Sequence, residues 1–259
     1  MRTWDATPAA MRKETAMSDV ILGIDTSSRV CIGLAKAGEV MASVSVGDSR
    51  SHAELLAPAV ESLMHANGLT WDDLAGVAVG MGPGPFTGLR VGVVAAEMLG
   101  LARGIPVYHV CSLDVVGVGW ALTSPAGEFI ACTDARRKEL YWALYDHFGQ
   151  RVAGPYVSAP EGLPNLPCVG PGTLLYPRAG GGMDSFLALK LGVRVDALAS
   201  EWPSLEQVPG IVGIDAGLLA AYARELPETG PEPLYLRRAD AAQPGAPKSV
   251  LAGVDRGER

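Results

Sequence analysis

The sequence predicts an α/β fold in which a three-stranded meander opens a mixed sheet. Three apolar runs rich in β-branched residues come first, and the residues Lys36–Glu39 between the second and third are typical of a hairpin turn. Helical periodicity then alternates with two further apolar runs, in the order β-β-β-α-β-α-β. The five expected strands are VILGID, VCIGLAK, VMASVSV, LAGVAVG and IPVYHV. This order favours a ribonuclease H-like, actin-like fold with helices packed against the sheet.

Two helices are predicted in this first half. Residues 52–67 place apolar side chains at helical spacing, and Gly68 is a suitable C-cap. The second helix runs to about Arg103, and Thr87 is positioned to act as its N-cap. Both helices connect strands and are expected to cover the sheet.

From Cys111 onward the pattern partly repeats, which predicts a second, more degenerate copy of the same unit. A helix from Ser112 to Leu122 is followed by the expected strands EFIACTDA, ELYWALYDHF, RVAGPYV and PCVG. Frequent proline and glycine predict loops between Gly162 and Gly210, and helical spacing returns from Ile211 to Leu226.

These patterns divide the chain into five parts. They are a disordered extension (1–18), a ribonuclease H-like domain (19–109), a degenerate actin-like domain (110–210), a C-terminal helix and extension that packs back on the domains (211–236), and a mobile tail (237–259). Because no period precedes the first strand, Met17 is a candidate for the true start of the protein, with Met1 as the alternative.

Charge and composition exclude several classes of protein. The net charge of −7 argues against unaided binding to a nucleic-acid backbone, which depends on clustered Lys and Arg. The four cysteines lie far apart without a CxxC pair, as expected of core residues in a reducing compartment. No run reaches the length of a membrane span, and residues 1–17 lack a signal-peptide core. We therefore expect a cytoplasmic protein that does not bind membranes.

The stretch GMGPGPFTGLR, residues 80–90, is the most unusual local motif. A glycine-rich loop that leads into a helix N-terminus is a possible anion site. The P-loop pattern nevertheless fails because no Lys-Ser or Lys-Thr pair follows the glycines, and Thr87 stands where a dinucleotide fingerprint requires glycine or alanine.

Two aspartates at strand ends allow a catalytic alternative. Asp25 and Asp134 each follow an apolar strand, and two such carboxylates could flank one cleft and hold a metal-bound phosphate. A small actin-like ATPase or phosphotransferase is therefore an alternative function, although an aspartate at a strand end is often a turn residue. The four histidines are scattered without a ligand spacing, and no GxSxG elbow occurs.

Four motifs together resemble the TsaB (YeaZ) family of bacterial tRNA threonylcarbamoyladenosine synthesis. They are ILGIDTSS, GPGPFTGLRVGVVAAEMLGLA, DARRKELYWALY and EPLYLRR, and the resemblance spans Asp19 to Asp240. The sequence departs from the family pattern at Pro85, where serine is usual, so that a backbone N–H and a hydroxyl are missing there.

The resemblance implies a non-catalytic subunit. The related transferase TsaD carries a metal-binding HxxxH, and the matching positions here are Ser112 and Val116, of which valine cannot bind a metal. The implied role is to pair with TsaD, alongside the ATPase TsaE, in transferring threonylcarbamoyl to the tRNA adenosine beside the anticodon. The chain by itself would form a homodimer, contact tRNA only indirectly, and bind no cofactor of its own, with ATP and metal on the partner subunits.

The helix after the glycine-proline loop is the candidate partner interface. Its apolar residues surround the axis, and its small residues recur every fourth position and could form a ridge for a second helix. The alternative is that this ridge packs on the protein's own sheet. The family resemblance implies that both N-terminal helices form the interface with a partner. The predicted interface is therefore His52, Leu55, Leu56, Ala59, Leu63, Gly88, Arg90, Gly92, Ala96 and Gly100, with Glu97 near its rim. The loop residues Gly82, Pro83, Gly84, Phe86 and Thr87 would act as a rigid support for it.

Overall fold

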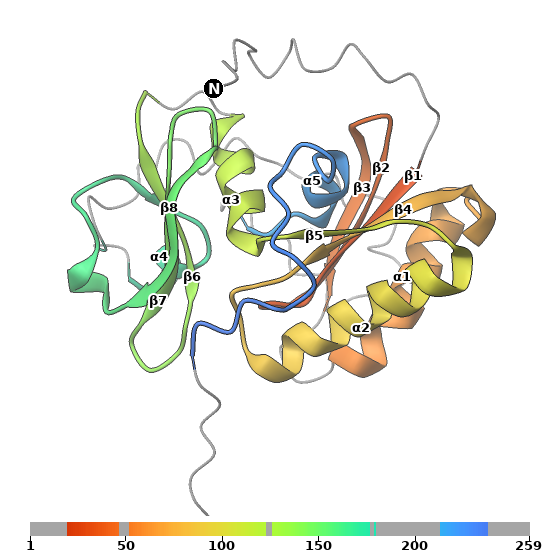
Figure 1. The fold of residues 1–259 in the computed structure, drawn as a ribbon, viewed down its shortest axis with the longest axis horizontal. Coiled ribbons are helices and arrows are strands. Elements are labelled where there is room, and N and C mark those ends of the chain that lie inside the picture. The colour runs from red at the N-terminus through yellow and green to blue at the C-terminus, as the bar shows by residue number, and fades with distance from the viewer. Residues whose placement is uncertain (1–19, 47–51, 123–125, 177–178, 180–212, 238–259) are drawn as a thin grey trace, which may run out of the picture.

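The computed structural model describes residues 20–46, 52–122, 126–176, 179 and 213–237, which form two sheets side by side with helices around and between them (Figure 1). The predicted extension (1–18), most of the predicted loop region and the predicted tail beyond residue 237 lie outside the described residues. The strands are β1 (Val20–Asp25), β2 (Val30–Lys36), β3 (Glu39–Val46), β4 (Leu74–Gly80), β5 (Val107–Val110), β6 (Phe129–Asp134), β7 (Leu140–Tyr145), β8 (Arg151–Ser158) and β9 (Cys168–Val169). The helices are α1 (His52–Ala66), α2 (Phe86–Arg103), α3 (Ser112–Ala121), α4 (Gly172–Leu175) and α5 (Ala216–Ala221), with short 3-10 helices at Trp71–Asp73 and Pro160–Gly162.

The first sheet has the strand order β3-β2-β1-β4-β5. The meander β1-β2-β3 is antiparallel, and β4 and β5 are added in parallel to β1. Parallel neighbours require a crossover, and α1 and α2 supply the two crossovers. The predicted mixed sheet and the predicted order of strands and helices along the chain are confirmed.

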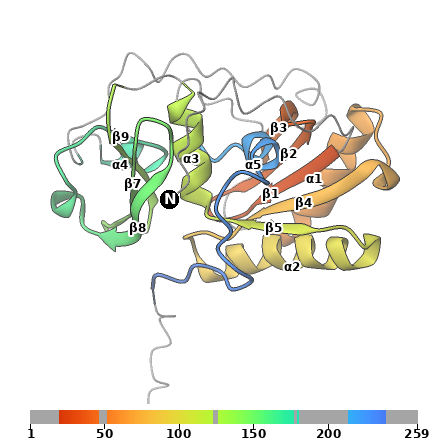
Figure 2. The same cartoon turned by 45° about the horizontal axis from the view of Figure 1, so that its top comes forward.

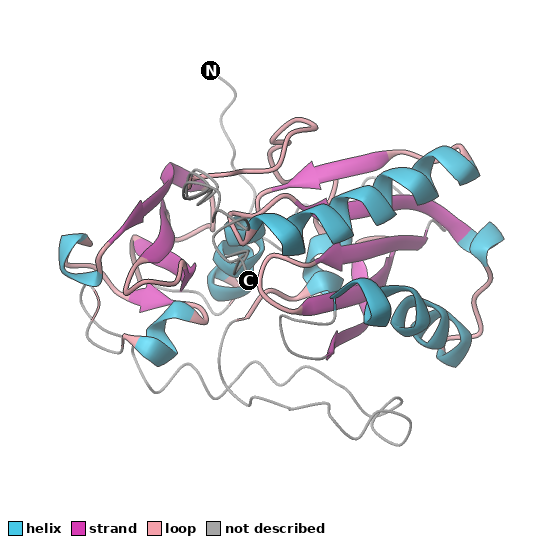
Figure 3. Cartoon of the chain, turned by 90° about the horizontal axis from the view of Figure 1, so that it is seen from below, coloured by secondary structure: helices cyan, strands magenta, loops and turns pink. Residues whose placement is uncertain are grey.

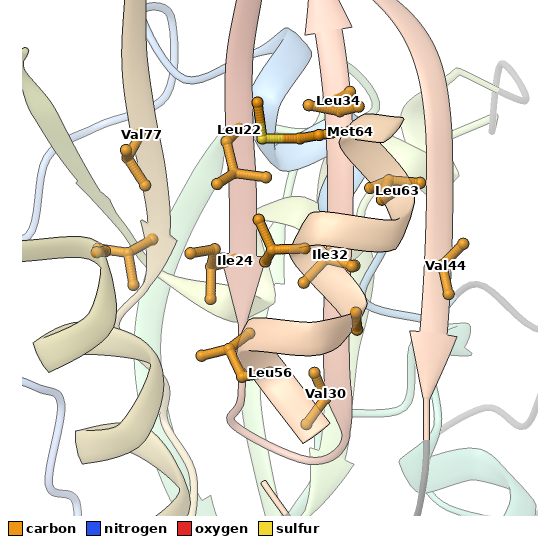
Figure 4. Close-up of a cluster of buried hydrophobic side chains, with 14 of the residues drawn as sticks. Leu22, Ile24, Val30, Ile32, Leu34, Val44, Leu56, Leu63, Met64 and Val77 are labelled. Carbon is orange, nitrogen blue, oxygen red and sulfur yellow. The ribbon is translucent and has the colours of Figure 1, made fainter. Parts of the chain in front are cut away.

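Alternating residues of the strands build a core on each face of this sheet. On one face, Leu22 and Ile32 belong to one core with Leu63 and Met64 of α1, and Leu22 lies beside Met64 (Figure 4). On the opposite face, Ile21 of β1 packs with Leu219 of α5, so the sheet is covered on both sides. The four cysteines are buried and form no disulfide, as predicted.

The second sheet repeats the beginning of the first in shorter form. Its order is β8-β7-β6-β9, in which β6-β7-β8 is an antiparallel meander and β9 pairs in parallel with β6. The repeat is reduced, since β9 consists of Cys168 and Val169 alone. Helices α3 and α5 lie between the two sheets (Figure 2). In the described part of the chain, no helix combines the length and apolar character needed to cross a membrane.

Two predicted helix boundaries are wrong. Helix α2 begins at Phe86 with Pro85 as its N-cap, so Thr87 lies within the first turn and is not the cap. The proline fixes its own φ at −62°, which places the chain at the helix entrance without a capping side chain. At the C-terminus, α5 covers Ala216–Ala221 and is much shorter than predicted, since turns follow it from Tyr222. Its N-cap is Asp215, whose side chain accepts hydrogen bonds from the Gly217 and Leu218 N–H groups.

The small-residue ridge of α2 faces the protein's own sheet, which corrects its predicted role as a partner surface. Gly88, Gly92, Ala96 and Gly100 are all buried in the single chain. The Thr26 hydroxyl donates to the Gly88 carbonyl at 2.8 Å and accepts from Gly92 N–H at 3.0 Å. Residues without bulk thus allow α2 to approach the end of β1 closely, and the alternative of internal packing is correct.

The predicted interface residues on α1 need the same correction. Leu56, Ala59 and Leu63 are buried in the main core, and Leu55 packs against it while partly buried. The side chain of His52 lies outside the described residues. Along α1 the apolar spacing therefore marks the face toward the sheet, as is usual for a helix with one exposed side.

A substitution at Gly92 tests this packing. An added Cβ there would lie 2.4 Å from Thr26 Oγ1, so we expect Gly92→Leu to lower the free energy of unfolding by about 2–3 kcal/mol through overpacking. Val94→Leu on the exposed side of the same helix should change it by less than about 0.5 kcal/mol. Urea unfolding of both variants measures the effect. A Gly92→Leu protein of unchanged stability that no longer associates with partners would contradict the inward orientation.

Candidate functional site

The carboxylate of Asp25 lies at the end of β1, fully buried, where the first sheet meets α3. Oδ1 accepts hydrogen bonds from the Ser27 N–H at 2.8 Å and the Ser27 hydroxyl at 2.7 Å. Oδ2 accepts from the Ser112 hydroxyl at 2.5 Å, and that same hydroxyl oxygen accepts from Gly82 N–H at 3.1 Å. The chain's own donors therefore stabilise this buried charge, and both oxygens are already engaged.

The glycine-proline loop packs directly on the turn that follows β1. Gly84 lies so close to Ser27 that an added Cβ would be 2.5 Å from the Ser27 carbonyl oxygen. The N–H of Met81 donates to the Val110 carbonyl at 2.7 Å, and that of Gly82 donates to Ser112. In a phosphate-binding loop, such N–H groups point at the ligand. Here these two bond the protein itself, so the loop holds the start of α2 against the sheet.

The Asp134 side chain binds Arg136 in the turn between β6 and β7. Its Oδ1 accepts a hydrogen bond of 2.7 Å from Arg136 N–H, and its Oδ2 pairs with the Arg136 guanidinium at 3.3 Å. Asp25 and Asp134 are thus each engaged within their own surroundings, which weakens the two-carboxylate alternative. Among the described residues, no group of three or more His, Cys, Asp or Glu side chains is arranged to hold a metal ion.

The outward face of α2 carries large apolar side chains that sequence reasoning did not select. Val94, Met98 and Leu101 are 59%, 60% and 79% exposed. They follow one another at spacings of four and three residues, so they form one stripe along the helix, which we call the outer stripe. Figure 3 shows α2 as the long helix along the surface of the first sheet. A contiguous exposed apolar face is characteristic of an interaction site.

The predicted residues at the start of α2 are exposed and contact one another. The Arg90 guanidinium lies 3.7 Å from the centre of the Phe86 ring, and both side chains are exposed, as is Thr87. They continue the direction of the outer stripe toward the N-terminus of the helix. Of the predicted interface, Arg90 is thus the residue of α2 that the structure places on the surface.

Comparison with known proteins identifies the family. The TsaD family model, described as tRNA N6-adenosine threonylcarbamoyltransferase, matches residues 46–254 of the chain. The tRNA threonylcarbamoyladenosine biosynthesis protein TsaB of Escherichia coli is 34% identical over 126 residues, which cover 48% of this chain and 54% of that protein. The chain belongs to the TsaB (YeaZ) family.

Further proteins are similar to this TsaB-family chain in sequence or in fold. An uncharacterized protein of Mycobacterium tuberculosis is 44% identical over 142 residues, covering 54% of this chain and 64% of that protein. The chain thus spans between about half and two thirds of the curated relatives it matches. The structure of YeaZ from Pseudomonas aeruginosa superposes with a TM-score of 0.60 at 23% identity, covering 84% of this chain and all of that one. This likeness shows that the fold is the YeaZ fold.

Ser112 and Val116, the positions that the family resemblance matched to the TsaD histidines, have structural roles in this TsaB-family chain. Ser112 and Val116 are both fully buried at the start of α3. The Ser112 hydroxyl donates a hydrogen bond to Asp25, and Val116 belongs to the core of the second sheet.

A second buried carboxylate, Asp114, was not singled out from the sequence. Its Oδ1 accepts a 2.8 Å hydrogen bond from the Tyr145 hydroxyl and lies 3.2 Å from Arg151 Nε. Its Oδ2 is buried without a hydrogen-bond partner in the part of the chain that is described. Burial raises the pKa of Asp114, and the Arg151 charge only partly opposes this shift. These contacts fasten α3 to β7 and β8. A charged residue inside the apolar run SLDVVGVGW is the sequence feature that could have indicated this buried site.

This cluster predicts a pH dependence of stability. Because the pKa of Asp114 is raised in the folded protein, the folded state binds this proton more tightly than the unfolded state. Relative to the Asp114→Asn protein, the free energy of unfolding of the wild type should rise as the pH falls through the raised folded-state pKa of Asp114. The difference should level off below the unfolded-state pKa of about 3.9. Denaturant unfolding of the two proteins across this range measures the difference. A pH-independent difference would show that the carboxyl titrates alike in both states.

Proposed function

We propose that this chain is a non-catalytic subunit in the transfer of threonylcarbamoyl to the tRNA adenosine beside the anticodon. In this role it binds a TsaD-type transferase, with a TsaE-type ATPase in the same cytoplasmic assembly, and forms a homodimer when alone. Its TsaB-family membership supports the pathway. The engaged Asp25 carboxylate and the buried, valine-containing start of α3 support the absence of a catalytic metal site of its own.

The outer stripe of α2 is the observation that carries this proposal. Three large apolar side chains, each more than half exposed, lie on a helix whose opposite face is already fixed to the sheet. Burial of a Val, Leu or Met side chain contributes about 1.5–3 kcal/mol, so covering all three would stabilise a complex substantially. The partner surface is thus made by the bulky residues of α2, whereas the small residues allow α2 to sit close to its own sheet.

Charge substitutions in the outer stripe test the interface. We expect Met98→Glu and Leu101→Glu each to weaken capture of the TsaD-type protein from the same organism by about tenfold or more, because the partner would have to desolvate a carboxylate. The free energy of unfolding should stay within about 0.5 kcal/mol of wild type, since both side chains are exposed. Titration with the labelled partner and urea unfolding supply the two measurements.

Leu174→Glu is the matched control for this test. Leu174 lies in α4 and is 56% exposed, so its exposure is similar to that of Met98. Helix α4 packs against the second sheet and not the first. Its replacement should leave partner capture unchanged. Equal loss of binding in all three variants, or in none, would refute the assignment of the interface to α2.

ATP turnover separates the proposal from the alternative of an actin-like ATPase or phosphotransferase. With cofactor, ATP and metal sites assigned to the partner subunits, the purified chain should release no phosphate from ATP above a buffer control. Asp134→Asn is the useful variant, because Asp134 is half-buried at the end of β6, whereas Asp25 is part of the core. Turnover by the wild type that this variant abolishes would favour the phosphotransferase.

A further inference from the structure

An exposed aromatic pair marks the start of α2. The ring of Phe86 lies 4.8 Å from the ring of Tyr235, centre to centre, with 41° between the planes. The two residues are 41% and 38% exposed, so their tilted contact leaves both side chains partly accessible. The Arg90 guanidinium covers part of the Phe86 ring. Together the three side chains present flat, partly cationic surfaces to solvent.

The segment that carries Tyr235 is fixed in place on both sides. The N–H of Leu234 donates to the Met81 carbonyl at 2.8 Å, and the Leu234 side chain packs against the cores of both sheets. The Arg237 guanidinium then forms an ion pair with Glu139 at the start of β7. In Figure 1 this segment, in blue, passes the start of α2 and reaches the turn between β6 and β7. The aromatic pair and that turn are thus joined by a few residues of chain.

The turn between β6 and β7 is basic and has an unusual backbone. Arg136, Arg137 and Lys138 are exposed, and their φ angles are +63°, +54° and +63°. Three successive non-glycine residues in the left-handed region cost about 1–2 kcal/mol each, and a turn with only a structural role more often uses Gly, Asn or Asp. Strain retained in a ligand-binding segment is a common reason for such outliers.

These residues form one strip, which we call the aromatic-basic strip: Phe86, Arg90, Arg136, Arg137, Lys138, Tyr235 and Arg237. It contains five cations, of which Arg136 pairs with Asp134 and Arg237 pairs with Glu139, although the whole chain has a net charge of −7. Net charge therefore hides a local concentration of positive charge beside exposed rings. This combination fits a ligand with both phosphates and unstacked bases.

We infer that the aromatic-basic strip binds single-stranded RNA, with bases stacked on Phe86 and Tyr235 and phosphates near the basic turn. The inference deepens the proposed function, on which it rests, by placing a direct tRNA contact on this chain. It departs from the expectation of indirect contact, which rested on the family resemblance and on the overall charge of the chain.

Two observations favour an RNA chain over a free nucleotide. Small-molecule sites usually enclose most of the ligand, whereas the residues of this strip are largely exposed and come from three separate segments. The glycine-proline loop beside it donates its Met81 and Gly82 N–H groups to the protein itself, so these groups are not available to a phosphate. Stacking on open rings also requires unpaired bases, which a loop offers and a duplex does not.

The test measures binding of a fluorescein-labelled anticodon stem-loop RNA that carries adenosine directly after the anticodon. Fluorescence anisotropy with the full chain should show binding that weakens with salt. Arg137→Glu combined with Lys138→Glu should weaken binding by about tenfold or more and reduce the salt slope by about two. Tyr235→Ala should weaken binding by about tenfold, whereas Tyr235→Phe should retain it because the ring remains.

Matched controls lie on the far side of the first sheet. Lys36→Glu reverses an exposed charge at the β2–β3 turn, and Trp71→Ala removes an aromatic ring that is 38% exposed, as Tyr235 is. Neither should change the RNA affinity. Circular dichroism and melting should be the same for all variants, because every altered side chain is exposed.

Several outcomes would overturn the inference. These are no RNA binding by the full chain, equal loss in strip and control variants, or equal competition by a base-paired RNA or by ATP. Capture of the TsaD-type protein by the same variants separates the two proposals. If the wild type fails to capture that protein, the proposed function fails; if strip variants lose that capture but keep RNA affinity, the strip contacts protein and the RNA inference fails.

Discussion

The buried carboxylate of Asp25 is the constraint on which the rest of the structure depends. A charge without solvent must be met by donors, and here they come from the next turn and from the first residue of α3, whose hydroxyl also accepts from the glycine-proline loop. One side chain thereby connects the end of β1, the glycine-proline loop that leads into α2, and the start of α3. The same arrangement accounts for the loop's glycines, because Gly84 must pass close to the backbone of Ser27.

The orientation of α2 follows from that constraint. With its N-terminus fixed by Pro85 and its glycine face against Thr26, the helix has only its bulky side left to present to solvent. Packing inside the chain and the surface offered to partners are therefore two consequences of one arrangement. An apolar face left exposed on a helix whose other side is already packed is characteristic of a surface that another molecule covers.

The second, reduced copy of the fold contributes to the same side of the molecule. Its first hairpin carries the strained basic turn, and the C-terminal segment links this turn to α2 by way of Leu234, Tyr235 and Arg237. In the part of the chain that the structure describes, this copy keeps the antiparallel meander β6-β7-β8 and the turn between β6 and β7. Asp114 accepts a hydrogen bond from Tyr145 and pairs with Arg151, and these contacts fix α3 to that meander.

The sequence by itself determined the order of strands and helices, the hairpin at Ala37–Gly38, the buried cysteines and the family, because these depend on local periodicity, turn chemistry and motifs. It did not determine which side of α2 faces inward, since a helix apolar on every side gives no preferred direction. Nor did it indicate that Phe86 would meet Tyr235, or that Asp114 would meet Arg151. Such contacts join residues far apart in the chain, and no local pattern encodes them. Only the tertiary structure, through close approach and the need to neutralise buried charge, decided them.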